Sequence, residues 1–423
     1  MKVTLLAPAP QGTLCAPPSK SEEHRALICA ALADAPTKIT CAATNDDIDA
    51  TIDCLCALGA DIKRQGHCLC VTPITQAPAF VKMDVRESGS TLRFLLPVIA
   101  ALGTRAHIAR RGRLPLRPLS PLRELLEQNG VSITEISDGA LEISGKLSGN
   151  DFAIAAHISS QFVSGLLLAL PLLALPNDCH IHLLGRVESR PYIDMTRCTL
   201  ASFGIHVTEQ DSVLTLPAHS RYISPGTCCI SGDWSGAAAF ACMGAVGKHP
   251  ITIMGIDPQS AQGDCAILSI LMQMGADVQI GTGQVTVSPA PLRGVEIDAT
   301  DIPDLVPVLA ATAALAQGKT HIYGASRLRY KESDRLAAVT ELLRTLGANI
   351  TQTEDGLIIV GKPALSGGTL NAYGDHRIAM TAAVASLGCT RPVTIDGAQA
   401  VNKSYPAFWE QLSALCTPDS VIL

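Results

Sequence analysis

The chain of 423 residues carries an internal repeat of about 72 residues, and this repeat constrains the fold more than any other feature. In each copy the end of a predicted helix is followed by a glycine and then by a predicted strand. A glycine at this place is typical of a residue that ends a helix with a positive φ angle. Apolar and polar residues then alternate, which predicts hairpins such as those at 133–145 and 278–289. The glycines are 71 to 74 residues apart: Gly59, Gly130, Gly204, Gly275 and Gly347.

A second marker raises the number of copies from five to six. It is an isoleucine in a short strand that follows an Ala/Leu-rich helix. The sixth glycine would fall near residue 419, where the chain ends, so we expect the N-terminal segment KVTLLAP to complete the sixth copy. The chain's two ends would then meet in one domain. The isoleucines are Ile39, Ile108, Ile181, Ile253, Ile322 and Ile395.

Six copies of alternating helices and strands predict two α/β domains of three copies each. We expect the chain to cross between the domains near residues 18–20 and 229–231. The first domain would cover residues 20–229, and the second would combine 1–19 with 230–423.

A polar segment opens the Ala/Leu-rich helix of every copy. Serine, aspartate and glycine at a helix start cap free backbone N–H groups, but capping does not explain the nearby cations Lys20, Arg25, Arg93 and Arg377. Positive side chains beside the positive end of a helix are unfavourable unless an anion is bound there. The segments therefore predict an anion site. They begin at Ser19, Ser88, Ser159, Gly232, Asp301 and Tyr373.

Two carboxylates, Asp304 and Glu332, belong to the same motifs. A passive anion binder would avoid carboxylates, because they repel the ligand, so their presence favours proton transfer. Among the arginines between 105 and 123, we expect Arg105, Arg110 and Arg123 on a solvated face. Arg117, in a loop before a helix, is better placed for a defined role.

Charge and composition exclude several classes of protein. A net charge of −6 and only 15 aromatic residues argue against a nucleic-acid binder. The longest apolar run, residues 162–176, is shorter than the roughly 20 residues of a membrane span and predicts a buried helix.

The cysteines indicate a reducing compartment. An odd count of 15, without a secretory signal, favours free thiols in the cytoplasm. The pattern CxC…CxC at Cys54, Cys56, Cys68 and Cys70 leaves a zinc site open, but we expect small buried apolar side chains there.

Nine segments together resemble the 5-enolpyruvylshikimate-3-phosphate synthase family, in order from about residue 16 to 409. That family is similar in fold to the UDP-N-acetylglucosamine enolpyruvyl transferases. The resemblance implies two inside-out α/β domains of three βαβαββ units each, with the active site in the cleft between them. The segments are PPSKSEEHRAL, ESGSTLRFLLP, SSQFVSGLLLALP, ESRPYID, GDWSGAAAF, IPDL, YKESDR, YGDHRIAM and NKSYPAFW.

The resemblance also implies a reaction, the transfer of enolpyruvyl from phosphoenolpyruvate to the 5-hydroxyl of 3-phosphoshikimate with release of phosphate. It proceeds by addition and elimination through a tetrahedral ketal, in the shikimate pathway to chorismate and the aromatic amino acids. By motif match, Asp304 is the base for the hydroxyl. Glu332 and Lys20 are the proton donors and charge stabilisers near the methylene carbon.

The same resemblance implies the substrate contacts. It implies a monomer and no metal or organic cofactor. The charge and the apolar run given above already argue against nucleic-acid and membrane partners, and the cysteines favour the cytoplasm. Tyr192 is expected to support the shikimate ring. The residues expected at 3-phosphoshikimate are Lys20, Ser21, Arg25, Ser159, Ser160, Gln161, Ser189, Asp304 and Lys331, and those at phosphoenolpyruvate are Lys20, Gly89, Arg117, Gln161, Arg335, Arg377 and Lys403.

Two positions depart from the family's pattern. Glu87 and Arg327 stand where relatives carry asparagine, and this affects the finer contacts. Two other functions stay open. A UDP-N-acetylglucosamine enolpyruvyl transferase commonly carries a cysteine in the loop that corresponds to 110–118, and this loop has none. A non-catalytic phosphometabolite-binding protein would not need Asp304, Glu332 and Lys20.

Overall fold

The computed structural model describes residues 1–43, 45–136 and 139–423, and its strands form six four-stranded sheets with the same internal order. In each sheet the second strand of a βαβαββ repeat lies between the first and the fourth. One example is β7 (Arg105–Ala109), which is parallel to β6 (Phe80–Asp84) and antiparallel to β9 (Leu141–Gly145). The predicted α/β fold with six repeats is therefore confirmed.

Contacts divide the chain into two compact units of three sheets each. One unit is Pro18–Ile230, and the other joins Met1–Pro17 to Ser231–Leu423. The chain thus passes between the units after Pro17 and after Ile230. The sequence analysis placed these crossings near residues 18–20 and 229–231, with domain boundaries after residues 19 and 229.

The unit Pro18–Ile230 contains three repeats. The first is β14 (Thr227–Cys229), α1 (Lys20–Ala31), β3 (Thr37–Thr40), α2 (Asp46–Ala57), β4 (Asp61–Gln65) and β5 (Cys68–Thr72). The second is β6, α3 (Gly89–Leu102), β7, the 3-10 helix η1 (Leu114–Leu116), α4 (Leu122–Gln128), β8 (Val131–Glu135) and β9. The third is β10 (Asp151–Ala155), α5 (Ser160–Ala169), η3 (Leu170–Leu173), β11 (Cys179–Leu184), α6 (Arg190–Ser202), β12 (Thr208–Gln210) and β13 (Val213–Leu216).

The other unit repeats the same plan. Its first repeat is β2 (Gly12–Cys15), α7 (Trp234–Val246), β15 (Ile251–Met254), η4 (Gly263–Ala266), α8 (Ile267–Met274), β16 (Asp277–Gly281) and β17 (Gln284–Ser288). The second is β18 (Glu296–Asp298), η5 (Pro303–Leu305), α9 (Val306–Ala314), β19 (Lys319–Tyr323), η6 (Ser326–Tyr330), α10 (Arg335–Thr345), β20 (Asn349–Gln352) and β21 (Leu357–Val360). The third is β22 (Gly368–Asn371), α11 (His376–Ser386), β23 (Val393–Asp396), η7 (Ala398–Lys403), α12 (Phe408–Leu415), β24 (Val421–Ile422) and β1 (Lys2–Leu5).

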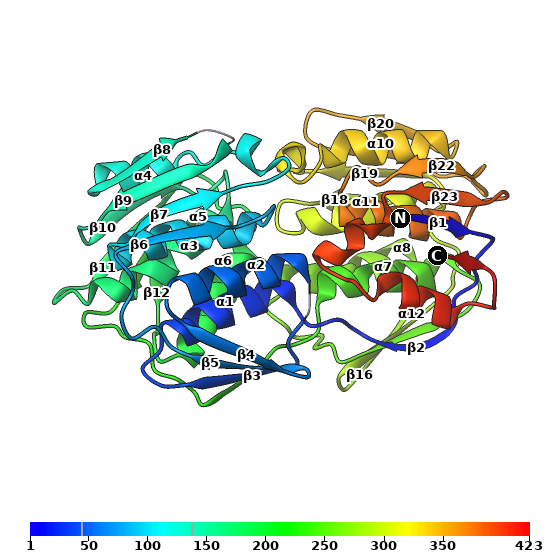
Figure 1. The fold of residues 1–423 in the computed structure, drawn as a ribbon. Helices are drawn as coiled ribbons and strands as arrows, with labels where there is room; N and C mark the ends of the chain where they lie inside the picture. The colour runs from blue at the N-terminus through cyan, green and yellow to red at the C-terminus, as the bar shows by residue number, and fades with distance from the viewer. Residues whose placement is uncertain (44, 137–138) are drawn as a thin grey trace. The chain divides into compact units, whose positions relative to one another are not determined.

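The N-terminal strand closes the last repeat, as predicted. Strand β1 lies between β23 and β24 and is antiparallel to both, so the first and last segments of the chain share one sheet (Figure 1). A second closure was not predicted. Strand β14, at the end of its unit, pairs in parallel with β3 and supplies the first strand of the first repeat.

Both sequence markers are confirmed. The six isoleucines lie in the second strand of their sheets and are at most 1% exposed. The five glycines that follow helices have φ angles between 83° and 108°. The tip of the predicted hairpin at 133–145 lies in part outside the described residues, at 137–138, while its strands β8 and β9 pair as expected.

Three buried helices pack against one another in each unit, α1, α3 and α5 in one and α7, α9 and α11 in the other. Twelve of the fourteen residues of α3 are buried, and a helix that is apolar on all sides belongs inside a core. The predicted buried helix at 162–176 is α5, which ends at Ala169 and continues as η3. Among the described residues, no helix combines the length and the apolar character that crossing a membrane requires.

Candidate active site

All six predicted polar segments open the buried helices, and five of them cap their helix. Each capping oxygen accepts a hydrogen bond from a backbone N–H two or three residues later. The sixth segment forms the 3-10 helix η5 instead, which places Asp304 just before α9. The cap residues are Ser19, Ser88, Ser159, Asp233 and Asp375.

In the unit Pro18–Ile230, two arginines face the first residue of α3. A Cβ atom placed on Gly89 would lie 2.7 Å from Nη1 of Arg93 and 2.8 Å from Nη1 of Arg117. A side chain at Gly89 would therefore displace both guanidinium groups. Two like charges beside a positive helix end are costly unless an anion is present, so this place fits a carboxylate or a phosphate.

Arg93 also connects two helix starts. Its Nη1 donates to Oε1 of Gln161 at 2.9 Å, and Nε2 of Gln161 donates to Oγ of Ser90 at 3.0 Å. The structure thus brings Gln161, at the start of α5, next to the start of α3. The sequence analysis counted Arg93 among the helix-start cations but did not place it at either substrate.

Arg25 lies inside this unit and binds mainly to the protein itself. Its Nε donates to Thr196, Nη1 donates to the carbonyl of Ser21, and Nη2 donates to Ser164 and to the carbonyl of Tyr192. Burial lowers the pKa of Arg25 to about 10. Because four of its five N–H groups are used internally, Arg25 orients Ser21 and Tyr192 as much as it can bind a ligand.

Lys20 stands at the start of α1 and pairs with Asp47 of α2. The Nζ atom lies 2.8 Å from Oδ2, and both side chains are largely buried. Asp47 was not predicted, because nothing in a sequence marks a partner 27 positions away. Nearby, burial raises the pKa of Glu23 to about 8, so this carboxyl group binds its proton near neutral pH.

The serines expected at the phosphate occupy the starts of α1, α5 and α6. Ser160 and Ser189 are buried, and Ser21 and Ser159 are half-buried. Ser189 has a φ angle of 53°, a left-handed conformation that a serine rarely adopts, directly before α6. Strained backbone of this kind gathers at ligand sites.

The other unit carries the carboxylates, with Asp304 at their centre. Arg335 Nη1 lies 2.7 Å from Oδ1 of Asp304, Lys331 Nζ lies 3.8 Å from the same oxygen, and Arg377 Nη2 lies 3.5 Å from Oδ2. Burial alone would raise the pKa of Asp304, but the charges of Lys331, Arg377 and Arg335 hold it well below its usual range. Asp304 is therefore ionised and fixed in position.

Arg335 bridges three carboxylates. It binds Asp304, it donates to Oε2 of Glu332 at 2.8 Å, and it donates to both oxygens of Asp375 at 2.8 and 3.2 Å. Burial opposes the charge of Arg335, and Asp375, Glu332 and Asp304 raise its pKa in spite of this. Asp375 caps α11 and is fully buried, and the sequence analysis did not single it out.

Arg377 links Asp304 to a second buried acid. Its Nη1 donates to the carbonyl of Ser235 at 2.7 Å, and the hydroxyl of Ser235 donates to Oδ2 of Asp264. Burial and the charge of Asp304 raise the pKa of Asp264 to about 7. Lys403, at the end of η7, is buried in the same unit.

The two groups differ in their balance of charge. The unit Pro18–Ile230 has more cations than anions at its helix starts. The cations are Lys20, Arg25, Arg93 and Arg117, and the anions are Glu22 and Asp47. In the other unit, Arg335 binds all three carboxylates, Asp304, Glu332 and Asp375. Lys331 and Arg377 also lie beside Asp304, so three cations accompany three carboxylates there. The first group suits anion binding, and the second suits proton transfer.

The expectation of a solvated face is wrong for Arg110. Arg110 is buried, because Glu135 neutralises it and the carbonyl of Gly139 accepts from its Nε. Arg105 is exposed, as expected, whereas Arg123 is only partly exposed and also donates to the carbonyl of Ile133. The departures from the family's pattern make local contacts, since Glu87 accepts from the backbone of Arg113 and Arg327 donates to the carbonyl of Thr300.

The cysteine expectation holds only in part. Cys54 is buried, but Cys56 is exposed, and Cys68 and Cys70 are intermediate. Within residues 1–43, 45–136 and 139–423, no three His, Cys, Asp or Glu side chains are arranged to hold a metal ion.

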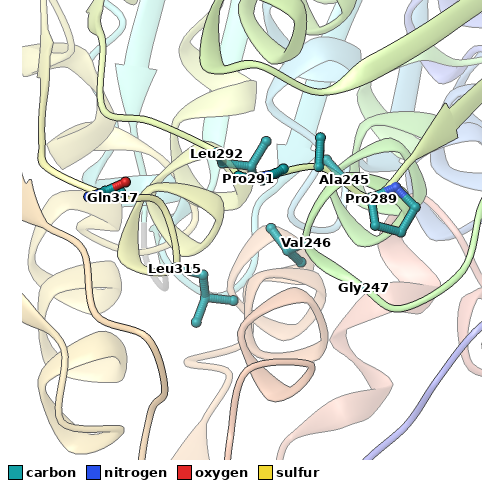
Figure 2. A pocket seen from close by; sticks show the side chains of 9 residues that line it. Ala245, Val246, Gly247, Pro289, Pro291, Leu292, Leu315 and Gln317 are labelled. Atoms are coloured by element: carbon teal, nitrogen blue, oxygen red, sulfur yellow. The ribbon is translucent and has the colours of Figure 1, made fainter.

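A cavity of about 490 Å³ opens at the ends of α7 and α9 (Figure 2). Apolar residues dominate its lining, and none of the described residues around it is charged, so it does not fit a phosphorylated ligand. Its lining is Ala245, Val246, Gly247, Pro289, Ala290, Pro291, Leu292, Leu315 and Gln317.

Comparison with known proteins adds independent information. Residues 8–412 match the family model described as EPSP synthase (3-phosphoshikimate 1-carboxyvinyltransferase). The chain is 41% identical to the 3-phosphoshikimate 1-carboxyvinyltransferase of Clostridium kluyveri over 96% of this chain and 95% of the relative. It is 38% identical to that of Clostridium perfringens over 98% of both chains.

Solved structures show the same fold. The EPSP synthase of Acinetobacter baumannii superposes with a TM-score of 0.81 at 24% identity, over 100% of this chain and 99% of that one. The enolpyruvyl transferase NikO of Streptomyces tendae superposes with a TM-score of 0.77 at 19% identity, over 100% and 98%.

Proposed function

The chain belongs to the EPSP synthase family, and we infer from this that its two charged groups of residues serve one enolpyruvyl transfer in the shikimate pathway. The enzyme transfers the enolpyruvyl group of phosphoenolpyruvate to the 5-hydroxyl of 3-phosphoshikimate and releases phosphate. The observation that carries the assignment of roles is the enclosure of Asp304 by Arg335, Lys331 and Arg377.

The reaction makes two demands on proton transfer. In the addition step the 5-hydroxyl loses a proton and its oxygen bonds to the central carbon of phosphoenolpyruvate, while the methylene carbon gains a proton. In the elimination step that carbon loses a proton again and phosphate leaves. A site therefore needs one group that accepts the hydroxyl proton and another that serves the methylene carbon.

Asp304 is our candidate for the hydroxyl proton. Its low pKa keeps it ionised and able to accept, but the same low pKa makes it a weak base while three cations surround it. A phosphate bound to Lys331 would offset part of this positive charge and raise the pKa of Asp304. Substrate binding would thus strengthen the base at the moment it is needed.

Glu332 and Lys20 are our candidates for the methylene carbon. Arg335 donates to Oε2 of Glu332, so a proton carried by this residue belongs on its other oxygen. Lys20 is oriented by Asp47 at 2.8 Å. We assign Lys20 the charge that stabilises the ketal as well as a share in proton transfer.

The helix starts of the unit Pro18–Ile230 are our candidates for the anionic groups. We place the phosphate of 3-phosphoshikimate at Ser159, Ser160 and Ser189 of this unit and at Lys331 of the other unit. Gly89, with Arg93 and Arg117 beside it, suits phosphoenolpyruvate, because an unsubstituted α-carbon lets the ligand approach backbone N–H groups. The remaining residues proposed at the two substrates are Ser21, Arg25, Gln161, Arg335, Arg377 and Lys403.

We also propose that the two units share these substrates. Asp304 and Lys331 belong to one unit, and Ser159 and Gln161 to the other, yet all four are proposed at 3-phosphoshikimate. Adding 3-phosphoshikimate should then lower the radius of gyration measured by small-angle X-ray scattering. An unchanged scattering curve at saturating ligand would contradict the shared site.

Phosphate release tests the acceptor directly. Pure protein is incubated with phosphoenolpyruvate and either 3-phosphoshikimate or UDP-N-acetylglucosamine. We expect stoichiometric phosphate and enolpyruvyl ether with the first acceptor and none with the second. Release only with the UDP-sugar would overturn the proposal, and so would binding of 3-phosphoshikimate without turnover. We further propose that the enzyme acts as a monomer in the cytoplasm.

A further inference from the structure

Cys41 and Cys229 form a pair of exposed thiols in the unit Pro18–Ile230, and neither belongs to the proposed active site. The hydroxyl- and carboxylate-rich helix starts do not involve them. Their sulfur atoms are 3.7 Å apart, within hydrogen-bonding distance for thiols.

The sheet register brings the two residues together. Strand β14 runs parallel to β3 and places Cys229 opposite Thr40, and the N–H of Ile230 donates to the carbonyl of Thr40 at 3.0 Å. Cys41 follows Thr40 and therefore lies beside Cys229. Its φ angle of 56° is left-handed, a conformation that costs a cysteine energy and turns the chain away from the strand. The contact is thus set by backbone geometry.

We propose that Cys41 and Cys229 are the site of a reversible intramolecular disulfide, formed by exchange with a small disulfide such as oxidised glutathione. A disulfide has an S–S distance of about 2.05 Å and joins Cα atoms that are roughly 4.4–6.8 Å apart. Cys229 lies opposite Thr40, one residue before Cys41. A strand separation of about 4.8 Å and a rise of about 3.3 Å per residue place the Cα atoms of Cys41 and Cys229 roughly 6 Å apart, which satisfies the second condition. Rotation about the two Cα–Cβ bonds supplies the approach of the sulfur atoms.

The exchange balances in two steps. One protein thiolate attacks a sulfur of oxidised glutathione, which forms a mixed disulfide and releases one glutathione thiolate. The second protein thiolate attacks the protein sulfur of that mixed disulfide and releases the other glutathione. The two cysteines lose two electrons and two protons, and the two glutathione molecules gain them.

Neighbouring thiols provide matched controls. Side chains alternate along a strand, so Cys228 points to the opposite face of β14 from Cys229. Cys68 lies opposite Thr40 on the other side of β3 and is only partly exposed. A disulfide at Cys41 and Cys229 would fasten β3 to the chain just before Ser231, where the chain leaves this unit.

The test measures which thiols disappear. The hydrogen bond with Cys229 and partial burial raise the pKa of the Cys41 thiol, so the full chain is treated with oxidised glutathione at mildly alkaline pH. Free thiols are then alkylated under denaturing conditions and counted by intact mass. We expect the wild type to lose two alkylatable thiols at least about tenfold faster than the rest, without a glutathione adduct and reversibly with dithiothreitol.

The variants decide the outcome. In Cys228→Ser and Cys68→Ser, two thiols should still be oxidised as fast as in the wild type. In Cys41→Ser and Cys229→Ser, this fast oxidation of two thiols should no longer occur. All four sites lie at or near the surface, and circular dichroism checks that each variant is folded. Fast loss of two thiols in the Cys41→Ser/Cys229→Ser double variant would overturn the proposal. Accumulation of only glutathione adducts in the wild type would overturn it too, whatever the transferase assay shows.

Discussion

Arg335 and Asp375 lie 40 positions apart in the chain, yet the arginine donates Nε and Nη2 to both carboxylate oxygens of the aspartate. Both side chains are buried, at 2% and 0% exposure. Asp375 also caps α11 by accepting from the N–H of Arg377. One buried carboxylate therefore fixes two arginines that we propose at phosphoenolpyruvate.

Asp375→Ala should destabilise the protein strongly. It removes a helix cap and one partner of a buried ion pair, and breaking such a pair costs about 3–5 kcal/mol. The matched control is Asp334→Ala, which removes the cap of α10 at a half-exposed site and should cost about 1 kcal/mol. Urea unfolding followed by fluorescence measures the unfolding free energy of both variants. Equal decreases in unfolding free energy in the two variants would contradict the structural role of Asp375.

Leu5 tests the closure of the sixth repeat. It is 1% exposed in β1, so Leu5→Ala should lower the unfolding free energy by about 2–5 kcal/mol even though Leu5 is only the fifth residue of the chain. Leu6, the next residue, is 38% exposed, and Leu6→Ala should change the unfolding free energy by less than about 0.5 kcal/mol. Similar thermal unfolding of the two variants would show that β1 does not hold its place in the sheet.

Asp264 should make stability depend on pH. Its folded-state pKa is raised to about 7 from 3.8 in the unfolded chain, so between these values the folded state holds a proton that the unfolded state has lost. The protonated carboxyl group therefore contributes stability at low pH, and this contribution is lost as the pH rises from about 4 to about 7. Above pH 7 the full loss in unfolding free energy, about 4 kcal/mol, is present.

Asp264→Asn should remove this dependence, because the amide stays neutral and its oxygen can still accept from Ser235. The difference in unfolding free energy between the variant and the wild type should grow from pH 5 to pH 8. A difference that stays constant over this range would refute the raised pKa.

Arg117 should matter for phosphoenolpyruvate and little for the fold. Arg117→Ala removes one of the two cations at Gly89, and the loss of a charge-assisted hydrogen bond of about 1.5–3 kcal/mol should raise KM for phosphoenolpyruvate roughly 10- to 100-fold. The control is Arg123→Ala, which removes an arginine that pairs with Glu127 on the surface of α4. Steady-state kinetics with both substrates measures KM for phosphoenolpyruvate in the two variants. Equal KM values would contradict the placement of Arg117 at phosphoenolpyruvate.

The sequence predicts the repeat well, because each copy carries local signals. A glycine with positive φ and a buried isoleucine follow from backbone conformation and strand burial, and these are properties of short segments. The closure by KVTLLAP follows from counting copies. Strand β14 was missed because TCC at 227–229 is too short to show a pattern, and its pairing with β3 is a contact between distant parts of the chain.

The candidate site shows the same limit. The motifs indicate Asp304, Glu332 and Arg335, but they do not indicate Asp375 or Asp47, since a buried carboxylate that orients a cation has the same local sequence as one in solvent. Arg110 illustrates the converse. Its partners come from β8 and the chain before β9, so its burial could not be predicted from its own neighbourhood.

The most direct test of the account is the effect of Asp304→Asn on turnover and on binding, measured on the same preparation. The asparagine keeps the size of the side chain but cannot accept the hydroxyl proton. We predict that kcat falls by at least 100-fold, a barrier increase of about 2.7 kcal/mol, while the Kd for 3-phosphoshikimate changes by less than about fivefold. A variant that keeps more than about a tenth of the wild-type kcat would exclude Asp304 as the group that takes this proton.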